Sequence, residues 1–256
     1  MEIRPEAQFL IDCCRVQQSD DWPGLGQRAS AVRCWDPMVT LSAQHGIATL
    51  VLPLVKELSE GGSVPDRVVS EVRQFAFFDV ARGVRLRSAL REMLPVLRDA
   101  GAEVIVLKGV ALASLVYSDP NARPSQDIDL LCKEEDYPKF RDALASLRYD
   151  TDADLTLPPR QAHHESYADR HFFHPDGFVH IELHVDSIKL GVRPRHSDSI
   201  WRRARPIEIE GAPALALGPE DQVLMLSVHL HRHGFNRLIW FKDIDLLIRR
   251  YEAELD

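Results

Sequence analysis

The sequence lacks the features that mark several large classes of protein. Its longest apolar runs, 47–55 and 102–107, are far shorter than the roughly 20 residues that span a bilayer. It has only four cysteines and no CxxC spacing, and residues 1–14 have no basic segment followed by an apolar one. We therefore expect a cytoplasmic protein with reduced thiols, no secretory signal and no membrane association.

An excess of positive charge is also absent. The chain has 31 Lys and Arg against 39 Asp and Glu, which gives a formal net charge of −8. This balance argues against a nucleic-acid partner held by bulk charge, although it leaves room for a small basic pocket that binds phosphates. Hydrophobic residues make up 45% of the 256 residues, which is typical of a globular protein with a sizeable core.

The residue pattern predicts three regions. Apolar residues recur at helical spacing through residues 1–100, and 68–101 is expected to form one long helix or two. Short β-rich runs alternate with helical segments over 101–190, whereas 191–256 is expected to be mainly helical. The predicted fold class is therefore α+β, with a mixed sheet flanked by helices and with helical N- and C-terminal regions.

Four strands are expected in the middle region. The runs 102–107 and 127–132 are short and apolar, and 165–174 and 178–185 flank an HPDG turn typical of a hairpin. A helix is expected to begin at Gly109, directly after the first strand. Backbone N–H groups at such a helix start can bind a phosphate.

Three carboxylates form the most informative group. Because side chains alternate along a strand, Asp127 and Asp129 are expected on one face, with Ile128 directed into the core. Two carboxylates this close repel unless a cation lies between them, and hard oxygen ligands favour Mg²⁺ or Mn²⁺. If the strand with Glu182 pairs beside 127–132, Glu182 meets the aspartates, and three carboxylates can hold one or two divalent ions.

These carboxylates belong to a longer pattern over roughly residues 70–250. Its parts are Leu107-Lys108-Gly109, Tyr117, Arg123, Asp127-Ile128-Asp129-Leu130-Leu131, Glu182-Leu183-His184, His229, and Trp240 to Asp243. The pattern resembles the polymerase-β-like nucleotidyltransferase superfamily. Within it, the pattern is similar to a poorly characterised bacterial group of nucleotidyltransferase family proteins.

The resemblance implies an activity. It implies a catalytic core over 101–190 with a Mg²⁺ and nucleotide site, which transfers a nucleoside monophosphate from an NTP such as ATP and releases pyrophosphate. The acceptor would be a hydroxyl of a small molecule, a peptide or a protein. The implied catalytic and metal-binding residues are Asp127, Asp129 and Glu182, and the implied phosphate contacts are Lys108, Gly109, Arg123 and His184.

Two departures from the superfamily leave a second interpretation open. Val110 stands where the superfamily has Ser or Gly after the glycine, and 18 positions separate Gly109 from Asp127, a long interval. A non-catalytic nucleotide-binding or antitoxin-like interaction protein that retains the fold would fit these departures. A third interpretation is a histidine-dependent metal hydrolase built on the histidine-rich segment 163–184.

Ordinary structural roles remain alternatives for several residues. Lys108 could be a solvated lysine at a strand end, and Arg123 could pair with a nearby carboxylate. His229 and His233 lie four residues apart and are expected on one exposed helix face. The second Asp-Ile-Asp, at 243–245, lies within an expected helix where positions i and i+2 do not face each other, so no catalytic role is predicted for it.

Overall fold

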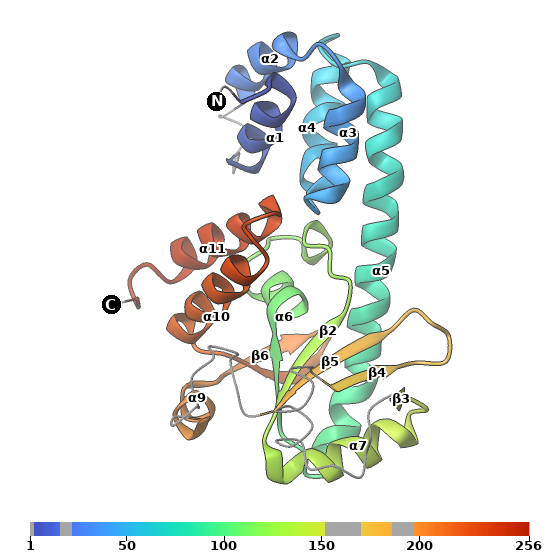
Figure 1. The fold of residues 1–256 in the computed structure, drawn as a ribbon, viewed down its shortest axis with the longest axis vertical. Helices are drawn as coiled ribbons and strands as arrows, with labels where there is room; N and C mark the ends of the chain where they lie inside the picture. The colour runs from blue at the N-terminus through green and yellow to red at the C-terminus, as the bar shows by residue number, and fades with distance from the viewer. Residues whose placement is uncertain (1–2, 16–21, 152–169, 186–196, 256) are drawn as a thin grey trace.

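A computed structural model describes residues 3–15, 22–151, 170–185 and 197–255. Figure 1 shows the first four helices gathered around the N-terminal half of one long helix, α5, and a sheet beside its C-terminal half. The helical character expected for residues 1–100 is confirmed over the described part of that range, and the segment after residue 65 is one helix rather than two. The bounds are α1 Pro5–Arg15, α2 Trp22–Ala31, α3 Trp35–Gln44, α4 Ala48–Glu60 and α5 Asp66–Asp99.

The N-terminal helices share one apolar core. Phe9 of α1, Met38 of α3 and Val51 of α4 are fully buried and pack with Val68 of α5. Ile239, from the last helix of the chain, packs into the same core. The N-terminal region therefore contacts the rest of the chain both through α5 and through the last helix.

The described residues form a mixed seven-stranded sheet in the order β3-β4-β5-β2-β1-β7-β6. β2 is antiparallel to β1 and parallel to β5, and β1 is parallel to β7. This confirms the predicted α+β class and its mixed sheet. The bounds are β1 Val104–Leu107, β2 Ile128–Cys132, β3 Asp150–Thr151, β4 Arg170–Phe173, β5 His180–Val185, β6 Arg205–Ile209 and β7 Ala212–Ala216.

The sheet extends beyond the middle region predicted from the sequence. β6 and β7 come from the segment 191–256, which was expected to be mainly helical. Both strands contain a proline, Pro206 and Pro213, and proline in a strand run weakens a strand prediction. β6 is the last strand in the order, and an edge strand is where proline is tolerated in a sheet.

Helices cover both faces of the sheet. On one face Val106, Ile128 and Leu130 pack against α5 and α7. On the other face Ile105 and Leu131 pack against the C-terminal helices. None of the helices in the described part of the chain is both long and apolar enough to cross a membrane. The remaining bounds are α6 Lys108–Leu115, η2 Pro120–Ala122, η3 Glu134–Asp136, α7 Tyr137–Ser146, α9 Ser197–Arg203, α10 Pro219–Arg232 and α11 Leu238–Tyr251.

Candidate active site

Strand pairing brings the predicted carboxylates together. β2 and β5 run parallel with Asp129 directly beside Glu182, so the pairing that the sequence required is present. Ile128 is fully buried on the α5 face, which leaves Asp129 on the face toward α10 and α11. Asp127 lies just before β2 and lines the same cavity.

A lysine and a histidine neutralise part of this negative charge. Lys108 Nζ lies 2.5 Å from Asp129 Oδ1 and 3.9 Å from Glu182 Oε2. His184 Nε2 hydrogen-bonds Asp129 Oδ1 at 3.0 Å and is 3.9 Å from Glu182 Oε2. Asp129 and His184 are both buried, so these interactions act with little screening by solvent.

The surroundings shift the pKa values of the three carboxylates in different directions. Burial raises the pKa of Asp127 and of Glu182, and the charge on Asp129 raises both further. Burial opposes ionisation of Asp129 too, but the His184 hydrogen bond and the Lys108 ammonium lower the pKa of that carboxyl well below its usual range. Burial would lower the pKa of Lys108, yet Asp129 and Glu182 outweigh it and raise that pKa. Asp129 is therefore the firmly ionised member, and the other two would gain most from an added cation.

The donor atoms are close enough to share a metal ion. One ligand atom each from Asp129, Glu182 and His184 lies within 4.8 Å of the others. Two carboxylates and an imidazole suit a divalent cation, with Mn²⁺ tolerating the nitrogen ligand better than Mg²⁺. This set differs from the predicted one because it includes His184 and does not include Asp127.

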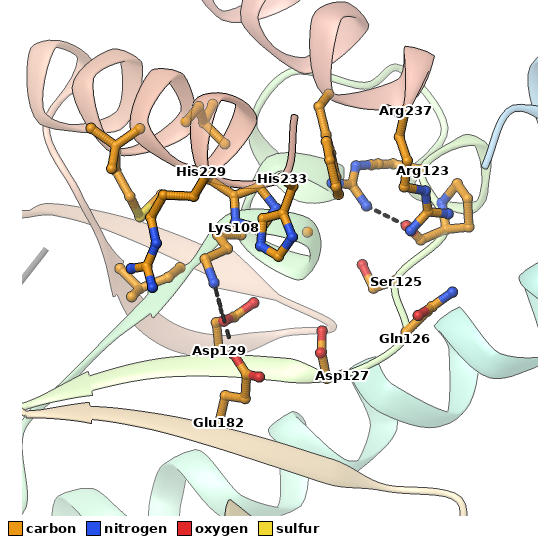
Figure 2. A pocket seen from close by; sticks show the side chains of 18 of the residues that line it. Lys108, Arg123, Ser125, Gln126, Asp127, Asp129, Glu182, His229, His233 and Arg237 are labelled. Atoms are coloured by element: carbon orange, nitrogen blue, oxygen red, sulfur yellow. Dashed lines mark hydrogen bonds and ion pairs between the residues drawn. The ribbon is translucent and has the colours of Figure 1, made fainter. Parts of the chain in front are cut away.

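These residues form one wall of a cavity of about 510 Å³. Figure 2 shows Asp127, Asp129 and Glu182 on the sheet side, with His229, His233 and Arg237 on the side of the C-terminal helices. A cavity of this size is typical for a small-molecule or nucleotide ligand. The acidic wall and the histidine- and arginine-rich wall face each other across it.

The start of α6 approaches the loop before β2 very closely. Lys108 has a left-handed backbone (φ 48°), which is unfavourable for a residue with a side chain, and α6 begins there rather than at Gly109. A Cβ on Gly109 would overlap Ser125 Oγ and lie 3.2 Å from an Arg123 guanidinium nitrogen. Glycine is therefore required at 109 because this loop occupies the space of a side chain.

Arg123 has a carboxylate partner. Its Nε and Nη2 donate hydrogen bonds to Asp243 of α11 at 2.9 and 2.6 Å, and the Tyr117 hydroxyl donates to the same carboxylate at 2.8 Å. Arg123 and Asp243 are both buried. Three separated parts of the sequence pattern thus meet in one network, which holds α11 against the loop before β2. The predicted phosphate contact of Arg123 stays a prediction.

The cavity also contains residues for which the sequence predicted no site role, among them His229 and Ser125. His229 was expected on an exposed helix face, but it lines the cavity, packs edge-on against Trp240 and lies beside His233. Burial, and then the Lys108 ammonium, lower the pKa of His229 to about 3. Its place in the family-like pattern was the only sequence signal. For Ser125, the only sequence signal was its closeness to Asp127.

The histidine-rich hairpin is only partly described. His171 and His180 face each other across β4 and β5, with Nδ1 and Nε2 2.8 Å apart. His163 and His164 lie outside the described residues. Among the described residues, the set close enough to share a metal contains one histidine, His184.

Comparisons with known proteins give the family. A remote structural similarity links the chain to an antigenic nucleotidyltransferase-like protein from Paracoccidioides brasiliensis, with 17% identity over 66% of this chain and 76% of that one and a TM-score of 0.43. ANT(2")-Ia in complex with adenylyl-2"-tobramycin is similar at 12% identity over 66% and 90%, with a TM-score of 0.47. No curated protein matches in sequence. The family model described as "Uncharacterised nucleotidyltransferase" matches residues 31–256, and the chain therefore belongs to this nucleotidyltransferase family.

Proposed function

We propose that this nucleotidyltransferase moves a nucleoside monophosphate from an NTP, such as ATP, to an acceptor hydroxyl and releases pyrophosphate, with Mg²⁺ or Mn²⁺ as cofactor. The family assigns the enzyme class, and the proposal adds the substrates, the metal and the residues. The observation that supports it best is the register of β2 and β5. That register sets Asp129 beside Glu182, and the Lys108 ammonium lies 2.5 Å from Asp129 and 3.9 Å from Glu182.

Asp129 and Glu182 would hold the metal, with Asp127 and His184 adjacent. The fit follows from the donor set, since two carboxylate oxygens and one imidazole nitrogen lie close together and already face a cation, Lys108. A divalent ion bound there would stabilise negative charge on the phosphoryl group and make the acceptor hydroxyl more acidic.

The protein's own groups would divide the remaining work. Lys108 and the backbone at Gly109 would bind phosphate oxygens, since an ammonium and a helix start both favour anions. Glu182 would accept the proton of the acceptor hydroxyl, since its carboxylate lies beside Asp129 at the proposed metal position. His184 would hold Asp129 in place, and Arg123 would hold the loop before β2 through Asp243.

The acceptor is proposed by class only. A small molecule, a peptide or a protein side chain would fit a cavity of about 510 Å³ with one acidic wall. The net charge of −8 argues against a long nucleic acid. We propose a cytoplasmic setting on the same sequence grounds as above.

The test uses Asp129→Asn, which keeps the shape of the side chain and removes its charge. The purified protein is incubated with each α-labelled NTP, with Mg²⁺ or Mn²⁺ and with a cell extract, and label transfer and pyrophosphate are measured. Wild type should label an acceptor, and Asp129→Asn should lower the rate at least ~100-fold because a metal ligand is weakened. The control is Asp142→Asn, an exposed aspartate of α7 bonded to its neighbour Arg141.

Two results would contradict the proposal. Equal rates of pyrophosphate release in wild type and Asp129→Asn would remove the metal assignment. Binding of a nucleotide by wild type without any transfer or pyrophosphate would favour the non-catalytic interpretation.

A further inference from the structure

Ser125 is a buried hydroxyl without a partner. It lies in the loop before β2 with 7% of its surface exposed, and it lines the cavity. Within the described part of the chain, no group hydrogen-bonds its Oγ. Buried hydroxyls nearly always have a partner, so a partner from outside the chain is expected.

The surroundings of this hydroxyl favour an anion. Ser125 Oγ faces Gly109 so closely that a side chain at 109 would overlap it. Gly109 is the second residue of α6, an eight-residue helix, and its first N–H groups have no partner within the helix. A hydroxyl donor and a helix start therefore lie side by side in the cavity wall. Figure 2 shows Ser125 between Arg123 and Asp127 on the cavity wall.

The side chain after the glycine does not reach this point. Val110 is 3% exposed and packs with Leu86 of α5 and Ile128 of β2 in the core. Residue 110 therefore faces the sheet, and a hydroxyl there would face the sheet as well. Only Ser125 presents a hydroxyl to the start of α6 among the described residues that line the cavity.

We infer that Ser125 Oγ donates a hydrogen bond to a phosphate oxygen of the bound nucleotide, beside the N–H groups at the start of α6. Ser125 thereby supplies, from a different segment, the hydroxyl that Val110 lacks. Glycine at 109 is the structural condition for this arrangement, because it lets the loop approach the helix. This inference rests on the proposed function and specifies its phosphate-binding residues.

Calorimetric titration of Ser125→Ala tests the inference. The ligands are the magnesium complexes of an NTP and of inorganic tripolyphosphate, which has the phosphates but no base or sugar. Ser125→Ala should bind both about 10-fold more weakly than wild type, as expected for one lost hydrogen bond to a charged group. Affinity for Mn²⁺ alone should not change.

A second measurement separates binding from folding. Because the hydroxyl has no partner in the protein, Ser125→Ala without ligand should unfold at the same temperature as wild type or slightly higher. Ser227→Ala is the matched control, since Ser227 is an exposed serine of α10 bonded to the Val223 carbonyl. It should leave binding of both ligands unchanged.

The outcomes are distinguishable. Equal binding of both ligands by wild type and Ser125→Ala would mean that only solvent meets this hydroxyl, and would overturn the inference alone. Weaker binding of the NTP but not of tripolyphosphate would assign Ser125 to the base or sugar, and would overturn the phosphate contact. Failure of wild type to bind either ligand would remove the proposed function together with the inference.

Discussion

The N-terminal helices and the sheet region bury different kinds of side chain. Among the described residues of α1–α4, Ser42 is the only buried polar side chain, and the rest of the core is apolar. The sheet and the C-terminal helices bury Arg123, Asp129, His184 and Asp243. Burial of charge is unfavourable unless the charges are paired, whereas apolar burial is favourable by itself. The core of the N-terminal helices therefore stabilises the fold. The buried charges near the candidate site instead carry a desolvation cost, which their pairing offsets.

Helix α11 belongs to both regions. Ile239 packs into the N-terminal core, and Asp243, one turn later, accepts the hydrogen bonds of Arg123. The loop that Arg123 holds leads directly to Asp127 and Asp129. Helix α11 therefore joins the N-terminal core to the site region, which makes the contrast between the two regions testable.

The largest effect is expected from Asp243→Ala. It leaves the buried Arg123 guanidinium without its carboxylate, and removal of one partner from a buried ion pair costs roughly 3–5 kcal/mol of unfolding free energy. Urea unfolding measures this loss. Asp142→Ala in α7 is the control, because its pair with Arg141 is largely exposed and is worth less than about 1 kcal/mol. Equal losses of unfolding free energy in the two variants would show that the buried Arg123–Asp243 pair stabilises the fold no more than an exposed pair does.

A smaller and purely structural effect is expected from Met38→Ala. Met38 is fully buried in the N-terminal core, and its truncation should lower the unfolding free energy by about 3 kcal/mol. At temperatures where the variant stays folded, kcat and KM should equal those of wild type. A changed KM in the folded variant would show that the N-terminal core shapes the site and would weaken the contrast between the regions.

The sequence predicted the parts of the site that follow from local rules. Strand alternation placed Asp129 on one face with Ile128 in the core, and strand pairing brought Glu182 beside it. His229 and Ser125 follow no such rule. Their position depends on how α10 packs over the sheet and on how closely the loop approaches Gly109. Both are tertiary contacts between segments that are far apart in the sequence, and no local residue pattern predicts them.

The same limit applies to the fold. The periodicity of α5 and the apolar runs of β1 and β2 are strong local signals, and both were predicted. β6 and β7 contain Pro206 and Pro213, which weaken the local signal. Their strand conformation depends on pairing, since β7 pairs with β1 on one side and with β6 on the other. The partner of β7 lies 110 residues earlier in the sequence, since Ile105 pairs with Leu215 and Val106 with Ala216.

The smallest expected effect concerns the pH dependence of stability and involves His229. Its pKa is about 3 in the folded protein because of burial, followed by the Lys108 ammonium, whereas an unfolded histidine has a pKa of about 6.5. Between these values the unfolded chain binds a proton that the folded chain does not. The contribution of His229 is therefore fully present above pH 6.5 and is lost as the pH falls.

Urea unfolding at pH 7 and pH 5 measures this contribution against His229→Gln, which cannot titrate. The unfolding free energy of wild type should fall by about 1 kcal/mol more than that of His229→Gln over this interval, roughly half of what the two pKa values give, because solvent screens a half-buried ring. His231→Gln on the exposed side of α10 is the control and should follow wild type. If wild type and His229→Gln instead lose the same free energy, His229 titrates as a solvated histidine, and the cavity wall formed by α10 is open to water rather than packed against the site.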